Sequence, residues 1–358
     1  MGDAVLEPVE AHALAGFPES DAGPALIHFK ASCAAPPVTI PMTARGSAED
    51  LAAACAKAVA TPADQAAAFF TANFTPYRIT RPGTKTGFLT GYFEPELQGS
   101  RIPDAAFPTP VLARPNDLVS FEPGETRPGF DPSLRAARAT TDGLVPYPDR
   151  AAIEDGALGS LARPILYLRD AVDLFVLQVQ GSGRVRLRDG SAVRVLYDGR
   201  NGRPYSSIAK RIVAEGHLPL EGLTLARWTS WLRANPETAR RLMRLNASYI
   251  FFRLAEIADP KLGPPGAAGV PLVPGVSMAV DANLWRYGLP FWLEGRVAGA
   301  SEPGRLVIAA DTGSAIVGPA RGDLYLGTGE AAGVAAGNLR DAIGFVVLLP
   351  KPLGSPKP

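Results

Sequence analysis

Residues 311–329 read DTGSAIVGPARGDLYLGTG, and the apolar run RLVIAAD (305–311) leads into them. Asp311 and Asp323 stand twelve positions apart in this stretch, each of them close to glycines. Apolar runs bounded by glycine-rich turns are typical of buried β-strands, and functional side chains often lie in the loops that follow such strands. The stretch therefore predicts a strand-rich fold that presents two carboxylates.

The letters Asp-Thr-Gly-Ser at 311–314 match the active-site loop of aspartic proteases, in which two carboxylates share one proton. That mechanism needs a second Asp-Ser/Thr-Gly loop. The other Asp-Gly pairs lack the intervening Ser or Thr, namely those at Asp142, Asp155, Asp189 and Asp198. A single-loop protease would dimerise, but its subunit would be far smaller than this chain. We keep an aspartic protease only as a minor alternative.

Composition favours a β-rich protein of two or three domains. The chain has 358 residues, of which 46% are hydrophobic, with 37 glycines and 35 prolines. Its net charge is +1, and no basic stripe suggests a nucleic-acid partner. A neutral or zwitterionic polymer is a better expected partner.

The two cysteines, Cys33 and Cys55, can form one disulfide or can be two small buried apolar residues, and the sequence leaves both alternatives open. LAAAC (51–55) looks like a lipoprotein cleavage box, but the preceding PMTARGSAED is not apolar. The first twenty residues show neither a cationic start nor an apolar run, so we expect no export signal in the chain as given. No apolar run approaches the length of a membrane span.

Four regions follow one another along the chain. Residues 8–80 are predicted to be helical, with a helix start at Thr61-Pro62-Ala63-Asp64. Residues 86–222 are predicted to be rich in strands, including a hairpin that turns at Asp189-Gly190. Residues 223–257 are again predicted to be helical, with a start at Asn235-Pro236-Glu237, and 259–350 to form short strands that end in IGFVVLLP.

The segment LFVLQVQGSGR (174–184) is predicted to be a strand, in which Gln178 and Gln180 share a face with Leu174 and Val176. Two amides followed by Ser182 can bind the hydroxyl and acetamide groups of a sugar, or they can belong to a solvated edge strand. Aromatic residues at Tyr92, Phe93, Tyr205 and Tyr249 can stack on sugars or pack in a core.

Cofactor and metal chemistry are not predicted. The glycine cluster GTGEAAGVAAG (327–337) lacks the spacing and the strand–helix alternation of a dinucleotide-binding loop. His12, His28 and His217 are far apart and show no metal-ligand spacing. We expect no cofactor and no metal.

Several blocks resemble, in order, the membrane-bound lytic murein transglycosylase A family. They are TGYFEP, RAAIEDGAL, LQVQGSGRVRLRDGS, YDGRNGRPYSSIAK, NASYIFFR and the stretch from 311 to 337. The resemblance runs from about residue 15 to 350. The last block is similar to a three-aspartate domain, whose aspartates would be Asp281, Asp311 and Asp323.

The resemblance implies a mainly β fold with flanking helices. A double-psi β-barrel domain would comprise residues 1–93 and 223–358, with the three-aspartate segment at about 270–350. A smaller β-domain, 94–222, would be inserted, with a glycan groove between the two.

The resemblance also implies an activity. The enzyme would cut the β-1,4 bond between N-acetylmuramic acid and N-acetylglucosamine and form a 1,6-anhydro product, with Asp323 as acid and then base. Asp311 and Asp281 would support it, unless they only cap turns. The residues expected to bind substrate are Thr90, Tyr92, Gln178, Gln180, Ser182, Tyr205, Asn246 and Tyr249.

The expected partner is the peptidoglycan glycan strand, met by a monomer in the periplasm or at the outer membrane, with cell-wall synthesis proteins as further candidate partners. A double-psi barrel protein that binds peptidoglycan without cleaving it is the main alternative. Exo- versus endo-cleavage, any need for stem peptides and lipid anchoring stay open.

Overall fold

The computed structural model describes residues 4–17, 19–36, 38, 45–122, 125–297 and 302–352. The chain divides into two compact units. Unit 1 comprises Met1–Tyr92, Pro265–Gly327 and Ala335–Pro358, and unit 2 comprises Phe93–Pro264 and Thr328–Val334. Each unit has its own sheet and its own apolar core.

The chain enters unit 2 at Phe93 and returns at Pro265, whereas the sequence predicted a return near residue 223. The reason lies in the pairing of the intervening elements. Strand β12 (Ile250–Ala255) pairs with β11 (Ala192–Arg200), so it completes the sheet of unit 2. Helices α7 (Leu225–Ala234) and α8 (Pro236–Arg244) share an apolar cluster with Val172 and Phe175 of the same unit.

Unit 1 is built on a nine-stranded sheet in the order β1-β2-β18-β14-β15-β13-β16-β3-β17. These strands are β1 (Val5–Pro8), β2 (Phe74–Thr80), β3 (Phe88–Glu94), β13 (Ser277–Ala279), β14 (Pro290–Glu294), β15 (Gly304–Asp311), β16 (Arg321–Thr328), β17 (Arg340–Asp341) and β18 (Gly344–Pro350). The predicted apolar runs form β15 and β18, in which nearly every residue is buried because both faces are covered. Strand β13 runs parallel to β15 and antiparallel to β16.

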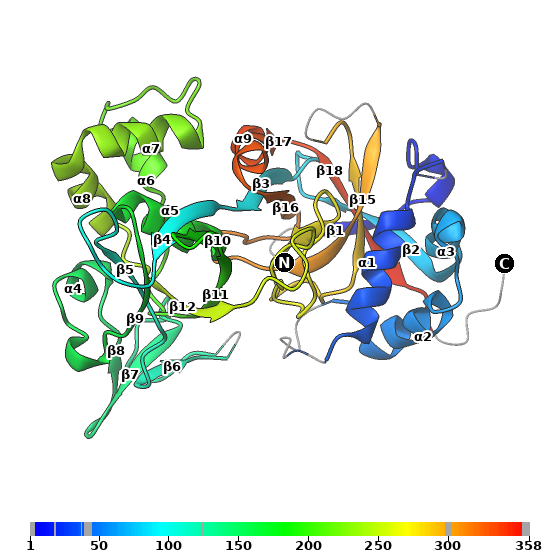
Figure 1. Ribbon diagram of the computed structural model, residues 1–358. Helices are drawn as coiled ribbons and strands as arrows, with labels where there is room; N and C mark the ends of the chain where they lie inside the picture. Colours follow the sequence, from blue (N-terminus) through cyan, green and yellow to red (C-terminus); the bar gives the residue numbers. More distant parts are fainter. Residues whose placement is uncertain are drawn as a thin grey trace. The chain divides into compact units, whose positions relative to one another are not determined.

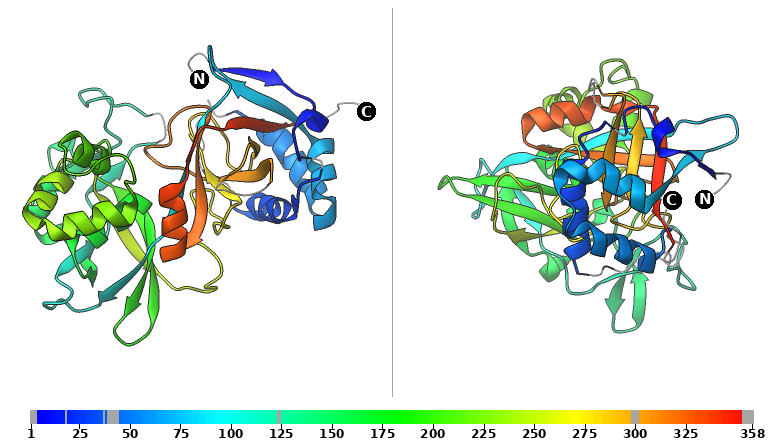
Figure 2. Two further views of the ribbon diagram at one scale, coloured as in Figure 1. Left: turned by 90° about the horizontal axis from the view of Figure 1, so that it is seen from above. Right: turned by 90° about the vertical axis from the view of Figure 1, so that its right-hand side faces the viewer.

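Three helices cover part of this sheet, and they appear in blue in Figure 1 and in the end-on view of Figure 2. They are α1 (Gly23–Ala34), α2 (Ala48–Ala58) and α3 (Ala66–Asn73). Phe29 of α1, Phe69 and Phe70 of α3 and Phe74 at the start of β2 pack their rings together. Cys33 and Cys55 are joined by a disulfide that links α1 to α2, which settles the alternative that the sequence left open.

The helix start predicted at 61–64 was wrong in detail. Pro62 precedes a short 3-10 turn, Ala63–Gln65, and α3 begins only after it. The Thr61 hydroxyl donates backward to the carbonyl of Lys57, so it does not cap the following helix. The predicted helical region 8–80 also contains the last residue of β1, a 3-10 turn at Ala11–Ala13 and strand β2.

Unit 2 holds a six-stranded sheet in the order β12-β11-β10-β4-β9-β5 and a three-stranded sheet β6-β7-β8. The strands not yet given are β4 (Glu96–Ser100), β5 (Thr109–Leu112), β6 (Leu118–Ser120), β7 (Ala136–Thr140), β8 (Gly143–Pro146), β9 (Pro164–Leu168) and β10 (Ser182–Leu187). Besides α7 and α8, the helices are α4 (Arg150–Glu154), α5 (Ala171–Gln180), α6 (Ile208–Ala214) and α9 (Glu330–Asn338), with a 3-10 turn at Gly159–Leu161. Helix α9 continues from unit 2 into residues of unit 1. The β10–β11 hairpin is confirmed, and its turn residue Gly190 has φ of 83°.

The strand predicted at 174–184 was wrong up to Gln180, because these residues form helix α5, whereas 182–184 do belong to strand β10. The side chain of Asp170 caps the helix by accepting from the N–H of Asp173, and Gly181 ends it with φ of 80°. Helix α5 is buried on nearly all sides because it lies between the sheet and helix α7. Its sequence therefore lacks the alternation of an apolar and a polar face by which a helix is recognised. Helix α8 does begin at Pro236 as predicted, but the helical region 223–257 also contains β12.

Within the described ranges, no helix has the length and apolarity needed to cross a bilayer. The same ranges contain no group of three His, Cys, Asp or Glu side chains arranged to hold a metal ion.

Candidate functional site in unit 1

Asp311 and Asp323 lie on either side of strand β13. Ala279 is the cross-strand partner of Asp311 in the parallel pair with β15 and of Asp323 in the antiparallel pair with β16. Two strand spacings separate the backbones of the aspartates, roughly 10 Å. The fold thus brings together the two carboxylates that the sequence placed twelve positions apart.

Asp323 lies near the start of β16, in a chain of hydrogen-bonded polar side chains. The Thr90 hydroxyl on β3 donates to Asp323 Oδ1 at 2.6 Å, and Arg321 Nη2 donates to Thr90 Oγ1 at 2.8 Å. The side chain of Asp323 is only partly exposed. Burial raises the pKa of Asp323 to about 6, against the opposing effects of the Thr90 hydrogen bond and the Arg321 charge.

Asp311 accepts from two donors of a different kind. Tyr92 Oη donates to Asp311 Oδ2 at 2.8 Å, and the backbone N–H of Ala267 donates to Oδ1 at 2.9 Å. Burial raises the pKa of Asp311 above its usual value, although both hydrogen bonds favour the ionised form. The ring of Tyr92 also packs on Tyr325 with centroids 5.4 Å apart, so the tyrosine is held from both sides.

The third predicted aspartate, Asp281, accepts hydrogen bonds mainly from backbone N–H groups. Its Oδ1 accepts from the N–H and the side-chain amide of Asn283, at 3.0 and 3.1 Å, and its Oδ2 accepts from the N–H of Gly318 at 2.8 Å. Gly318 belongs to the loop between β15 and β16. Asp281 is 6% exposed and holds in place the loop that leads from Asp311 to Asp323.

Strand alternation explains how β3 and β16 build this site. Phe88, Thr90 and Tyr92 are spaced by two along β3, as Arg321, Asp323 and Tyr325 are along β16, and the two strands are neighbours in the sheet. Residues spaced by two point to the same face of a strand. Sequence reasoning predicted Thr90 and Tyr92 but missed Arg321, although its position two residues before Asp323 was a usable signal.

The other predicted residues lie in unit 2. Gln178, Asn246 and Tyr249 are buried, at 3%, 2% and 3% exposure. Gln178 Nε2 donates to the carbonyl of Ile250 at 3.1 Å, and Asn246 Oδ1 accepts from the N–H of Ser206 at 3.0 Å. The Tyr249 ring lies 5.2 Å from the guanidinium of Arg150, a buried residue that sequence reasoning also missed.

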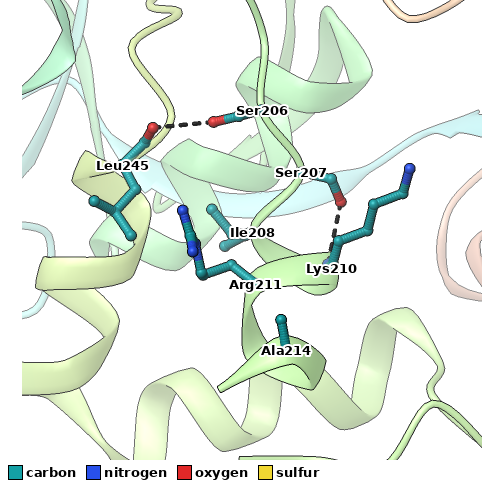
Figure 3. Close-up of a pocket in the computed structure, with 7 residues that line it drawn as sticks. All are labelled: Ser206, Ser207, Ile208, Lys210, Arg211, Ala214 and Leu245. Carbon is teal, nitrogen blue, oxygen red and sulfur yellow. Dashed lines mark hydrogen bonds between the residues drawn. The ribbon is translucent and has the colours of Figure 1, made fainter. Parts of the chain in front are cut away.

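Three predicted residues of unit 2 keep some exposure. They are Gln180, Ser182 and Tyr205. Gln180 Oε1 accepts from the N–H of Phe93 at 3.2 Å. Burial raises the pKa of Tyr205. Unit 2 also has an open pocket of about 250 Å³, shown in Figure 3, beside the segment that follows Tyr205. Ser207, Lys210 and Arg211 line it, and no carboxylate does, so it offers no acid for catalysis.

Family models match two parts of the chain. Residues 88–253 match the MltA specific insert domain, and residues 276–349 match the 3D domain. The first match covers most of unit 2, and the second covers β13 to β18 with all three aspartates.

Two curated proteins named membrane-bound lytic murein transglycosylase A are similar in sequence. The one from Vibrio cholerae is 32% identical over 269 residues, which cover 72% of this chain and 64% of the relative. The one from Escherichia coli K12 is 30% identical over 258 residues, which cover 70% and 62%. The chain thus spans slightly less than two thirds of the length of these curated relatives.

Two solved structures are similar to this chain over nearly its whole length. A membrane-bound lytic murein transglycosylase from Agrobacterium tumefaciens is 34% identical with a TM-score of 0.84, covering 96% of this chain and 97% of its own. A monoclinic structure of MltA from Neisseria gonorrhoeae is 30% identical with a TM-score of 0.78, covering 100% and 96%.

Proposed function

The chain belongs to the membrane-bound lytic murein transglycosylase A family, and on that premise we propose that it cleaves peptidoglycan without water. The bond broken is the β-1,4 link between N-acetylmuramic acid and N-acetylglucosamine. The muramyl O6 attacks C1 of its own sugar, and a 1,6-anhydro ring forms. The observation that carries this proposal is Asp323, a partly exposed carboxyl whose pKa burial raises to about 6.

One carboxyl is sufficient for this reaction. Asp323 gives its proton to the leaving O4 of N-acetylglucosamine as the C1–O4 bond breaks, and then takes the proton of O6 as the new C1–O6 bond forms. Ordinary glycosidases need a second carboxylate as nucleophile or base, but here the nucleophile belongs to the substrate. Intramolecular attack has an effective molarity on the order of 10⁵ M or more. The acid is therefore the main group that the protein must supply.

Asp311 and Asp281 take supporting roles in this proposal. Asp311 holds the Tyr92 hydroxyl, and its negative charge adds slightly to the raised pKa of Asp323. Asp281 fixes the loop between the two other aspartates through Gly318. Neither role needs Asp311 or Asp281 to exchange a proton with substrate.

The expected substrate contacts remain proposals. Thr90 and Tyr92 lie beside the acid in unit 1, and Gln180, Ser182 and Tyr205 offer partly exposed polar or aromatic groups in unit 2. Gln178, Asn246 and Tyr249 would act from within unit 2 by shaping its surface, since they are buried. We also propose that unit 1 is a double-psi β-barrel, which the parallel pairing of β13 with β15 within its sheet supports.

The substrate implies a place of action. Peptidoglycan lies in the periplasm, so we propose that the protein acts there, on glycan strands and as a monomer. Association with the outer membrane and with wall-synthesis proteins belongs to the same proposal.

The geometry gives less support to the two alternatives. An aspartic protease needs two carboxylates that share a proton, but Asp311 and Asp323 bond to Tyr92 and Thr90 respectively. A binding module without cleavage would have no use for a carboxyl whose pKa burial raises to about 6.

Digestion of purified murein sacculi tests the proposal, with products identified by mass. Wild-type protein is expected to release products one water lighter than reducing muropeptides, and Asp323→Asn none. Reducing-end products would mean hydrolysis and would shift attention to Asp311. Sacculi that are bound by both proteins and cleaved by neither would favour the binding module.

A further inference from the structure

We propose that Arg321 is a positioning residue for the acid: acting through Thr90, its guanidinium directs a hydroxyl proton onto Asp323 Oδ1 and leaves Oδ2 to carry the proton that is transferred. The catalytic consequence of this arrangement rests on the proposed function. The arrangement itself concerns only three side chains of unit 1.

The direction of the two hydrogen bonds follows from the chemistry of the groups. A guanidinium has only donors, so in the 2.8 Å contact between Arg321 Nη2 and Thr90 Oγ1 the hydroxyl oxygen must accept. The single hydroxyl proton is then free to point at Asp323 Oδ1, 2.6 Å away. Without the arginine, the hydroxyl could rotate and accept from the carboxylic acid instead.

Arg321 is itself held in place. Its Nη1 donates to the carbonyl of Phe88 at 3.3 Å and to that of Gly322, and its guanidinium carbon lies 5.2 Å from the centre of the Phe88 ring. No ion pair of Arg321 occurs among the residues that the structure describes. Asp323 is the acidic group that acts on its charge, so the guanidinium serves this carboxyl rather than a structural salt bridge.

The hydrogen bond that Asp323 Oδ1 accepts from Thr90 determines which oxygen of the carboxyl carries the transferable proton. Over the described part of the chain, Thr90 is the side chain that donates to Asp323, and it donates to Oδ1. The proton of the neutral acid therefore resides on Oδ2. The Thr90 bond and the Arg321 charge also favour the ionised carboxyl and oppose the effect of burial on its pKa, so both keep the group able to lose its proton as well as to hold it.

Two readouts test the inference, and one needs no turnover. The pH titration of Asp323 is followed by NMR of protein labelled at the aspartate carboxyl carbon, with Asp323→Asn to assign the signal. The pH dependence of kcat and KM is measured on soluble glycan strands. The variants are Arg321→Met, Arg321→Lys, Thr90→Val and Arg321→Met with Thr90→Val. Arg340→Met is the matched control, because Arg340 pairs with Thr90 across β17 and β3 but is exposed.

Arg321→Met is expected to raise the titration midpoint of Asp323, to move the high-pH limb of kcat upward by the same amount and to lower kcat by about tenfold or more with little change in KM. Arg321→Lys should restore part of kcat, because a lysine keeps the charge without the planar fork. Thr90→Val should also raise the titration midpoint of Asp323. The fold-loss in kcat of the double variant should be smaller than the product of the two single fold-losses. Arg340→Met should change neither readout.

An unchanged titration midpoint of Asp323 in folded Arg321→Met would overturn the inference. It would also be overturned if the fold-losses in kcat of the two single variants multiplied fully in the double variant. A raised KM with kcat intact would instead assign Arg321 to substrate binding and also overturn it. If wild-type protein yields no anhydro product, the proposed function fails, but the NMR titration still decides whether Arg321 acts on Asp323 through Thr90.

Discussion

Asp311 and Asp323 are neighbours of the same residue, Ala279, from opposite sides of strand β13. This relationship separates their roles, because each carboxyl is held by a different hydroxyl of strand β3. Thr90 and Tyr92, two positions apart on β3, bond to Asp323 and Asp311 respectively. The site therefore contains one carboxyl that can titrate near neutral pH and a second that orders a tyrosine.

Asp323→Asn is expected to abolish turnover while the protein stays folded. General acid–base catalysis contributes about 10²- to 10⁴-fold, and here one group supplies both steps. The amide can still accept from Thr90, so the surrounding polar chain survives. Release of anhydromuropeptides and binding to sacculi are measured together. Lost turnover with retained binding supports the assignment, and residual turnover close to that of wild type would contradict it.

The raised pKa of Asp323 predicts the pH dependence of activity. The reaction begins with the protonated acid, so kcat should be highest below about pH 6 and fall about tenfold per unit well above it. Initial rates measured across this range give the limb directly. A limb near the ordinary pKa of an aspartate would show that burial does not control this carboxyl.

The same shift has a consequence for stability. Because the folded pKa is above the unfolded value of 3.8, the folded state is favoured below pH 3.8, and this contribution is lost as pH rises through about 6. The ionised carboxyl then costs up to about 3 kcal/mol, so Asp323→Asn should stabilise the protein at neutral pH. Urea unfolding of both proteins at about pH 8 and pH 5 should show the larger gain at the higher pH. Equal gains would contradict the linkage.

Glu94 is expected to be important for the stability of unit 2. It is 0% exposed and accepts from Arg184 Nε at 2.8 Å, Arg194 Nε at 2.7 Å and Thr328 Oγ1 at 2.8 Å. Glu94→Gln would leave two buried guanidinium groups uncompensated, at a cost of about 3–5 kcal/mol.

Glu96→Gln is the matched control for this prediction. Glu96 lies two residues further along and pairs with Arg186 at 2.6 Å, but on the exposed surface. Its loss should cost less than about 1 kcal/mol. The free energy of unfolding of both variants is measured by denaturant titration. Similar losses of stability would show that burial does not distinguish the two ion pairs.

His28 should make the protein less stable in acid. It is buried against Ser277, with Nε2 2.9 Å from the hydroxyl, and burial lowers its pKa to about 4. Between pH 6.5 and about 4 the unfolded chain binds a proton that the folded protein does not, so stability falls as pH falls through this range. The loss of stability amounts to at most about 3.5 kcal/mol. His28→Gln should be less sensitive than wild type to this pH change, whereas parallel curves would refute the prediction.

The Cys33–Cys55 disulfide should stabilise unit 1 without affecting catalysis. It closes a loop with a sequence separation of 22 and joins α1 to α2. Loop closure of this length is worth about 3 kcal/mol in the unfolded-chain model. Cys33→Ser with Cys55→Ser should lower the melting temperature, and reductant should lower that of wild type to the same value. Turnover per folded molecule should not change, and a large change would connect these helices to the site.

Local sequence was sufficient to predict the elements whose turn, capping or apolar pattern is strong. Asp189-Gly190 predicted the β10–β11 hairpin, Asn235-Pro236 the start of α8, and the run IGFVVLLP the buried strand β18. The motif order also pointed to the family that the comparisons show. These features depend on turn chemistry, on capping and on apolar runs, all of which are local along the chain.

Tertiary structure alone decided three further features. Helix α5 looks like a strand in sequence, because burial on nearly every side removes the polar face that would reveal its period. The return of the chain to unit 1 depends on β12 pairing with β11, a contact that spans many residues. The acid is held by Thr90, which lies 233 positions away from Asp323 and itself accepts from Arg321. Only a folded sheet can bury the carboxyl and bring that hydroxyl to it.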